Sequence, residues 1–87
     1  MLVIVRILLV DDHELFRKGL QALLGPDAEL ELEGAASVAE ALARAHSGSY
    51  ELVLLDLKMP GVEGMEGLRA MREAVPAVPV VVLSGEE

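Results

Sequence analysis

Apolar runs and amphipathic stretches alternate along this chain. Short continuous apolar runs at residues 7–10, 52–57 and 80–83 predict strands buried on both faces. At residues 29–33 leucines alternate with glutamates, which predicts a half-exposed edge strand. Between the strands, apolar positions recur every three or four residues from 15 to 24, from 38 to 45 and from about 63 to 74. This spacing predicts three helices.

Local signals predict where the first two helices begin and end. Asp12 can cap the first helix, and the Gly-Pro pair at 25–26 stops it. Ser37 with Glu40 three residues later forms a capping box at the start of the second helix. That helix ends near residues 47–48.

The alternation of four strands with three helices predicts an α/β fold. Parallel strands joined by helices need right-handed crossovers. A doubly wound parallel sheet of order 2-1-3-4 then places the first and third strands side by side. Hydrophobic content is 53%, with one Phe, one Tyr and no Trp, so the core must be aliphatic. With 87 residues the chain forms one small domain.

Three carboxylates fall where neighbouring strands of this sheet end. Asp11 and Asp12 close the first apolar run, and Asp56 interrupts the run at 52–57. Open α/β sheets bind their ligands at this edge, and like charges held together favour a bound cation or an abnormal titration. Oxygen ligands alone favour Mg²⁺, and an aspartate oxygen beside the metal is a nucleophile toward phosphorus. The pattern therefore predicts a Mg²⁺-dependent phosphoryl-transfer site.

Several of these residues also have a plain structural interpretation. Asp12 could serve only as a helix cap, and Asp56 taken alone could be an exposed residue at a strand end. Ser84 follows the fourth predicted strand and can either bond a phosphoryl oxygen on Asp56 or act as a loop serine. Lys58 offers its backbone carbonyl to the metal. We interpret His13 as a solvated residue of the first helical turn rather than as a ligand.

Composition narrows the possible partners. Fifteen acidic against seven basic residues give a net charge of -8, which disfavours nucleic-acid phosphates and anionic lipids. The absence of cysteine excludes disulfides, thiolate catalysis and thiolate zinc sites. The apolar stretch at residues 1–5 is too short for a signal peptide or a membrane span. We therefore expect a cytoplasmic protein that binds neither nucleic acid nor membrane directly.

Three segments resemble the receiver domains of two-component response regulators. Residues 8–17, Leu-Leu-Val-Asp-Asp-His-Glu-Leu-Phe-Arg, are most similar to the subfamily whose output is a helix-turn-helix DNA-binding domain. Residues 54–61, Leu-Leu-Asp-Leu-Lys-Met-Pro-Gly, resemble the phosphoacceptor segment of that family. Residues 80–85 are similar to the strand that ends in its switch hydroxyl. The three motifs stand in the family's order and spacing.

The resemblance implies a flavodoxin-like fold and a role in phosphorelay signal transduction that regulates transcription. Asp56 would accept a phosphoryl group from a sensor histidine kinase, and Ser84 would be the switch hydroxyl. Asp11, Asp12, Asp56 and the carbonyl of Lys58 would hold Mg²⁺, with Asp11 acting chiefly through a water. Beyond its own phosphorylation and dephosphorylation, such a domain is not an enzyme.

The resemblance also implies that residues 1–87 are a single receiver domain truncated after its fourth strand. Members of the family continue with a fourth helix, a fifth strand that carries a phosphate-contacting lysine, and a fifth helix. Without that final strand and the last two helices, residues 80–83 form an apolar strand with an unpaired edge. We therefore expect a homo-oligomer formed through this strand.

Two other functions fit parts of the pattern. A receiver-like assembly module would oligomerise without phosphotransfer and could keep the same acids. A Mg²⁺-dependent phosphohydrolase would need a general acid two residues after its nucleophilic aspartate. At that distance Asp56 is followed by Lys58, and Asp11 by His13, so the sequence favours the receiver function.

Overall fold

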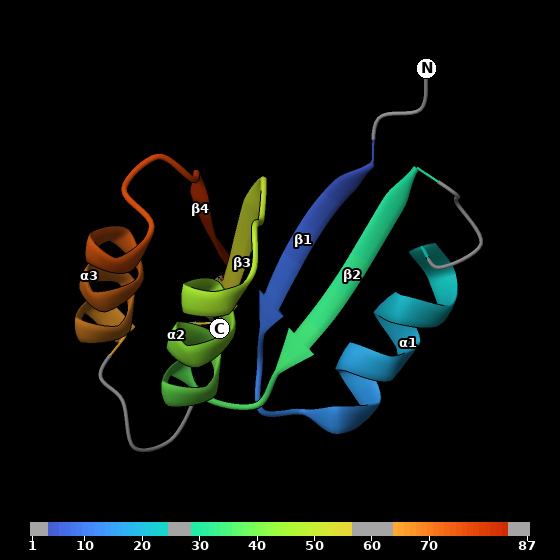
Figure 1. Cartoon of the computed structure of the whole chain (residues 1–87). Coiled ribbons are helices and arrows are strands. Elements are labelled where there is room, and N and C mark those ends of the chain that lie inside the picture. The colour runs from blue at the N-terminus through green and yellow to red at the C-terminus, as the bar shows by residue number, and fades with distance from the viewer. Residues whose placement is uncertain (1–3, 25–28, 57–63, 84–87) are drawn as a thin grey trace.

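The computed structural model describes residues 4–24, 29–56 and 64–83. Strands and helices alternate through these ranges as the sequence predicts (Figure 1). The strands are β1 (Val5–Val10), β2 (Leu30–Ala35), β3 (Leu52–Asp56) and β4 (Val80–Leu83), and the helices are α1 (Glu14–Leu24), α2 (Val38–Ser47) and α3 (Gly64–Ala74). Among the described helices, none is long and apolar enough to cross a membrane.

The four strands form one parallel sheet in the order β2-β1-β3-β4, which confirms the predicted order. Strand β1 lies in the middle, with its residue Val10 opposite Ala35 of β2 and Leu55 of β3. At the end of β3, Asp56 is opposite Leu83 of β4. The carboxyl ends of β1 and β3 therefore lie side by side, at the end of the sheet toward which the arrow of β1 points in Figure 1.

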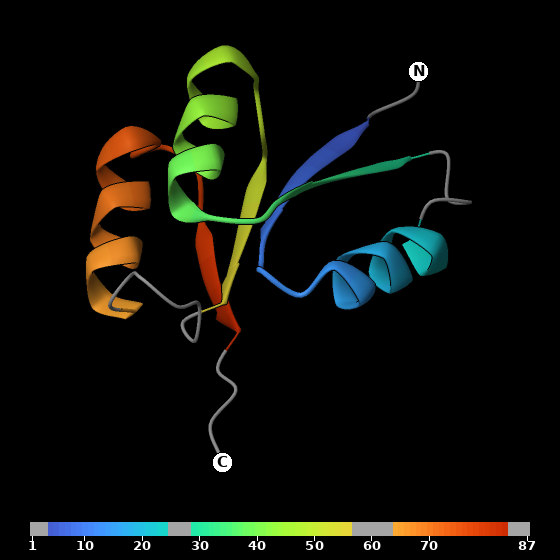
Figure 2. The ribbon, with the colours of Figure 1, turned by 90° about the horizontal axis from the view of Figure 1, so that it is seen from below.

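Helices α2 and α3 cover one face of the sheet and enclose the main core, whereas α1 lies on the other side (Figure 2). Alternate residues of the central strands point into this core because successive strand side chains face opposite ways. The buried cluster comprises Leu8, Val10, Ala35, Val38, Ala41, Ala45, Tyr50, Val53, Leu55 and Met71. It is aliphatic apart from Tyr50, as the composition predicts, and each buried large side chain contributes about 1.5–3 kcal/mol.

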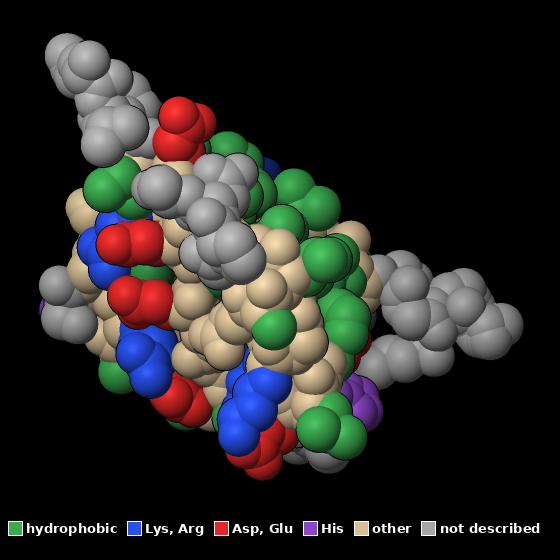
Figure 3. Space-filling model, turned by 90° about the vertical axis from the view of Figure 1, so that its right-hand side faces the viewer, with side chains coloured by type: hydrophobic (Ala, Val, Ile, Leu, Met, Phe, Trp, Pro, Cys, Tyr) green, Lys and Arg blue, Asp and Glu red, His purple; other side chains and the backbone are tan. Residues whose placement is uncertain are grey.

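Helix α1 packs less closely than the other two. None of its residues is buried, and Leu15 is 85% exposed, with Phe16 and Leu23 also exposed. The periodicity at 15–24 predicted the helix correctly but does not lead to burial, because α1 packs mainly on β2 at the side of the sheet. Hydrophobic side chains consequently lie at the surface on this side of the molecule (Figure 3).

Both ends of α2 follow the predicted signals. The Ser37 hydroxyl accepts a hydrogen bond from the Glu40 N–H at 3.1 Å, and the Glu40 carboxylate accepts one from the Ala36 N–H at 2.9 Å. At the other end the Gly48 N–H donates to the Arg44 carbonyl at 2.8 Å. The capping box is therefore confirmed, and its serine stabilises the helix by about 1 kcal/mol.

Arg6 ties the beginning of β1 to β2 and to the segment before β3. Its guanidinium lies 3.1 Å from the Glu31 carboxylate and 2.9 Å from that of Glu33, and 5.0 Å from the centre of the Tyr50 ring. The Tyr50 hydroxyl donates to Glu33 at 2.6 Å. The hydrogen bonds from Tyr50 and Arg6 hold the pKa of Glu33 below its ordinary value of 4.5.

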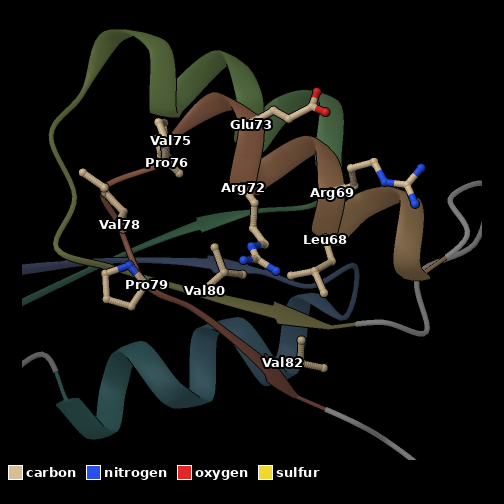
Figure 4. A pocket seen from close by; sticks show the side chains of 11 residues that line it. Leu68, Arg69, Arg72, Glu73, Val75, Pro76, Val78, Pro79, Val80 and Val82 are labelled. Carbon is tan, nitrogen blue, oxygen red and sulfur yellow. The ribbon is translucent and has the colours of Figure 1, made fainter.

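An open groove of about 980 Å³ lies between α3 and β4 (Figure 4). Leu68, Val80 and Val82 line it, and Arg72 extends from α3 toward Val80. None of the four β4 residues is buried, and Val81 is 44% exposed. The composition of β4 predicts a strand buried on both faces, and this prediction is wrong. Among the described strands only β3 pairs with β4, which leaves its other edge uncovered.

Candidate functional site

The three predicted carboxylates meet at the carboxyl end of the sheet. Asp11 directly follows β1, and Asp56 is the last residue of β3. One ligand atom each from Asp11, Asp12, His13 and Asp56 lies within 4.8 Å of the others. Asp11 and Asp56 are only 5% and 9% exposed. The convergence predicted from the strand order is confirmed.

Asp11 is held by its backbone on both sides. Its N–H donates to the Ala35 carbonyl of β2 at 3.0 Å, and its own carbonyl accepts a hydrogen bond from the Arg17 guanidinium at 2.6 Å. The Asp11 carboxylate accepts the backbone N–H of His13 at 2.7 Å. These contacts leave little freedom for the segment that follows β1, so Asp11 is presented to the cluster in a fixed position.

Arg17 reaches Asp11 by crossing β2 at a glycine. A β-carbon on Gly34 would lie 3.0 Å from the Arg17 Cδ, closer than ordinary packing allows without a shift. The small residue therefore leaves room for the guanidinium that holds the Asp11 carbonyl. This role of Arg17 was not predicted from the sequence. The sequence signal for this contact is a positively charged side chain on the first helix, six positions after Asp11.

Asp12 is not placed as a helix cap. Helix α1 begins at Glu14, and the residue directly before it is His13, whose carbonyl accepts the Arg17 N–H at 3.0 Å. The Oδ1 atom of Asp12 is buried and has no hydrogen-bond partner among the described residues. A buried carboxylate oxygen without a hydrogen bond is costly, so this atom needs a positive group beside it. The His13 ring lies 3.2 Å away, and a bound cation would serve in the same way.

His13 is exposed, as predicted, but its ring turns toward the acids. Its side chain is 67% exposed, and Nδ1 lies 2.9 Å from the Asp11 Oδ1 and 3.2 Å from the Asp12 Oδ1. The hydrogen bond with Asp11, together with the charges of Asp12, Asp11 and Asp56, raises the pKa of His13 above its ordinary value of 6.5. This contact with the carboxylates was missed by the sequence interpretation, which placed His13 in solvent alone.

Two predicted site residues lie outside the described residues. They are Lys58, expected to offer its carbonyl to the metal, and Ser84, expected to be the switch hydroxyl. Their roles remain predictions. Within the described residues, the acidic cluster has the donor set typical of a Mg²⁺ site: carboxylate oxygens, one of them without a hydrogen bond, at the edge of the sheet.

Comparison with known sequences agrees with this geometry. The family model of the response regulator receiver domain matches residues 7–87. The chain is 49% identical over 57 residues to the DNA-binding transcriptional activator DevR/DosR of Mycobacterium tuberculosis, a match that covers 64% of this chain and 26% of that protein. The response regulator protein VraR of Staphylococcus aureus is 38% identical over 60 residues, covering 68% and 29%. The chain thus spans only 26–29% of the length of these relatives.

Solved structures share the fold. The response regulator protein TrrA of Thermotoga maritima, in complex with Mg²⁺–BeF, has a TM-score of 0.83 and 33% identity, covering 97% of this chain and 72% of that one. TrrA has also been solved in complex with the histidine kinase ThkA, with the same TM-score and identity to this chain. The family match extends over nearly the whole sequence, and the strand order and the acidic cluster agree with it. The chain belongs to the family of response regulator receiver domains.

Proposed function

We propose that this domain is the phosphoacceptor module of a two-component response regulator and that Asp56 accepts the phosphoryl group. The observation that carries the proposal is the position of Asp56: it ends a central strand, is 9% exposed, and lies in a cluster with two further carboxylates. Burial beside other acids is costly for a residue with a purely structural role. This buried position beside other carboxylates suits a residue that must contact both a cation and a phosphoryl group.

The reaction would transfer a phosphoryl group to an Asp56 carboxylate oxygen. A bond from that oxygen to phosphorus forms while the bond between phosphorus and the donor breaks, and the donor leaves with its electron pair. Mg²⁺, when bound, neutralises charge on the phosphoryl oxygens. Asp11 and Asp12 would hold the cation together with Asp56 and the Lys58 carbonyl, and Ser84 would bond the phosphoryl group once it is attached.

The partner in this proposal is a sensor histidine kinase, which supplies the phosphoryl group from phosphohistidine. The complex of TrrA with ThkA supports this choice, because it shows a similar domain bound to a histidine kinase. The product would act on a transcriptional output domain, in line with the DNA-binding activity named for DevR/DosR. The domain itself is a signalling switch, whose only reactions are its own phosphorylation and dephosphorylation.

Intact-mass spectrometry after incubation with acetyl phosphate and Mg²⁺ tests the proposal. Wild-type protein should gain one phosphoryl adduct, and Asp56→Asn, which keeps the side-chain shape, should gain none. Chelation of Mg²⁺ should abolish the adduct in the wild type. Folded wild-type protein that gains no adduct, or an adduct that persists in Asp56→Asn, would contradict the assignment.

For the 87-residue chain we also propose self-association through β4. The proposal is supported by the exposure of Val81 and by the pairing of β4 with β3 alone among the described strands. An apolar strand edge of this kind pairs readily with a second copy. Sedimentation at micromolar concentration should show a dimer or larger species, and Val81→Lys should shift it toward monomer. A well-folded wild-type monomer at that concentration contradicts this proposal and also removes support for a pure assembly module.

A further inference from the structure

Gly34 stands in β2, opposite Leu9 of β1, although its backbone does not require a glycine. Its φ lies outside the left-handed region that favours glycine, and the parallel register continues on both sides of it. A glycine inside a strand weakens the strand, and it often marks a place where another group approaches closely. The reason for this glycine should therefore lie in the group that packs against it.

The group that packs against Gly34 is the middle of the Arg17 side chain. A β-carbon at position 34 would lie 3.0 Å from the Arg17 Cδ, 3.1 Å from Nε and 3.8 Å from Cβ. Carbon atoms in contact are normally about 3.5–4.0 Å apart, so Cδ and Nε would have to move by about 0.5 Å. Beyond Nε the guanidinium is planar and rigid, so this movement is passed on to Nη1. That nitrogen donates the 2.6 Å hydrogen bond to the Asp11 carbonyl, which even a methyl group at position 34 would thus disturb.

The hydrogen bond to the Asp11 carbonyl affects two carboxylates. Because the peptide bond is planar, the Asp11 carbonyl and the Asp12 N–H turn together. On the other side, the Asp11 N–H donates at 3.0 Å to the carbonyl of Ala35, the residue after Gly34. Arg17 and Ala35 therefore fix the backbone before and after the Asp11 Cα. The directions in which the chain presents Asp11 and Asp12 depend on both contacts.

We propose that Gly34 is a positioning residue of the cation site, because it leaves the passage through which Arg17 crosses β2 and holds the peptide between Asp11 and Asp12. Gly34 has no side chain to offer to the site, so it acts only through Arg17. Arg17 belongs to α1, a helix without a buried residue, so packing of the helix does little to fix its side chain. The glycine and the arginine then act as one unit. The inference rests on the cation site of the proposed function.

A double-mutant cycle in Mg²⁺ affinity, measured by calorimetry, tests whether the two residues act together. Arg17→Ala removes the guanidinium, and Gly34→Val fills the passage with a side chain that suits a strand. Each change should weaken Mg²⁺ binding by about tenfold, the lower end of the range for an outer partner of a metal ligand. Because both changes break the same hydrogen bond, the double variant should also bind about tenfold more weakly, and not about a hundredfold.

The chain offers a matched control for each change. Lys18→Ala removes the neighbouring cation of α1, which pairs with Glu14, and Gly19→Ala adds a β-carbon that meets nothing within 4 Å. Both control variants should bind Mg²⁺ like the wild type. If Gly34→Val does not fold, Gly34→Ala takes its place in the cycle, with a smaller weakening in the same direction.

Thermal unfolding of the metal-free protein shows whether Arg17 is what excludes a larger side chain at position 34. In the Arg17→Ala background, Gly34→Val should raise the thermal midpoint, because valine favours a strand and the passage is empty. In the wild-type background the same change should lower the midpoint or raise it less. An equal fall in both backgrounds would show that another group excludes the side chain, which overturns the proposal.

Carbon NMR of the metal-free protein gives a readout that general destabilisation would not move. The ¹³C resonance of the Asp11 carbonyl should move upfield in Arg17→Ala and in Gly34→Val, since the carbonyl is less polarised without its hydrogen bond. A resonance that stays in place in Gly34→Val overturns the proposal. Unchanged Mg²⁺ affinity in that variant, or a double variant about a hundredfold weaker than the wild type, does the same.

The failure of this inference is distinguishable from the failure of the proposed function, because neither affinity nor carbonyl shift uses phosphoryl transfer. Wild-type protein that gains a phosphoryl adduct from acetyl phosphate and Mg²⁺, while Gly34→Val binds Mg²⁺ normally, keeps the receiver chemistry and loses the positioning residue. Weaker Mg²⁺ binding in both single variants, without any adduct in the wild type, keeps the positioning residue and loses the receiver chemistry. Wild-type protein that binds no Mg²⁺ overturns both.

Discussion

Replacing Asp56 by asparagine should make the metal-free domain more stable. The substitution keeps the size of the side chain and removes one of three negative charges gathered at the end of the sheet. Both Asp11 and Asp56 are almost completely buried, so water screens their repulsion poorly. The negative charge of Asp56, which phosphoryl transfer needs, would therefore lower the free energy of unfolding.

The geometry sets the size of the effect. The cluster atoms lie within 4.8 Å of one another. Two unit charges at that distance repel by about 0.9 kcal/mol in bulk water and by about 3.5 kcal/mol at an effective dielectric constant of about 20. Loss of the Asp56 charge removes two such repulsions, while contacts made by its carboxylate are weakened. We expect a net gain of about 1–3 kcal/mol in the free energy of unfolding.

Urea unfolding followed by circular dichroism measures this gain. It is best made at about pH 8.5, because the pKa of His13 is raised above its ordinary value of 6.5 and its attraction to Asp56 weakens only when the ring loses its proton. Glu73→Gln, an exposed acid on α3, is the matched control for net charge and should change stability by less than about 0.5 kcal/mol.

Mg²⁺ should narrow the difference between the two proteins. A free concentration ten times Kd stabilises the wild type by about 1.4 kcal/mol, and Asp56→Asn gains less because it lacks one ligand. A metal-free variant no more stable than the wild type, or one that gains as much from Mg²⁺, would refute the argument from charge repulsion.

Three further predictions concern the core, the acid range and the segment after β1. Met71→Ala removes a fully buried side chain and should lower the free energy of unfolding by about 2–5 kcal/mol in a urea titration; a loss under about 1 kcal/mol would speak against its core position. The lowered pKa of Glu33 stabilises the fold above the ordinary value of 4.5, and this stabilisation is lost as pH falls through the lowered pKa. The thermal midpoint should therefore decrease as the pH is lowered beyond about 4.5, and this decrease should be smaller in Tyr50→Phe. An equal dependence of the midpoint on pH in the two proteins would exclude the hydrogen bond as the cause. Arg17→Met removes the hydrogen bond to the Asp11 carbonyl and should weaken Mg²⁺ binding by about tenfold in calorimetry; unchanged affinity would show that Arg17 does not position the site.

The sheet and the position of the acids were predictable because both depend on patterns of residue type. Continuous apolar runs identified β1 and β3, which are covered on both sides by neighbouring strands. Once their order was inferred from handedness, Asp11 and Asp56 had to lie at one edge. The capping box at Ser37 was equally predictable, since its two hydrogen bonds depend on a fixed spacing of three residues.

The contacts of His13 and Arg17 could not be predicted in the same way. They depend on the path of the backbone between Asp11 and the start of α1, which periodicity does not describe. The exposure of α1 has a similar origin. Spacing shows which face of a helix is apolar, but not which part of the sheet lies opposite that face. The exposure of β4 likewise depends on its neighbours and not on its own composition.

The loose packing of α1 has a consequence for local unfolding. The helix has no buried residue and is tied to the sheet by side-chain hydrogen bonds from Arg17 and Gln21 to backbone carbonyls. Its amide hydrogens should therefore exchange with solvent earlier than those of β1 and β3. Because the acids before α1 belong to the same cluster as Asp56, a bound cation would join the start of this helix to the rigid centre of the sheet. Occupancy of the site would then be readable as slower hydrogen exchange in the first turn of α1.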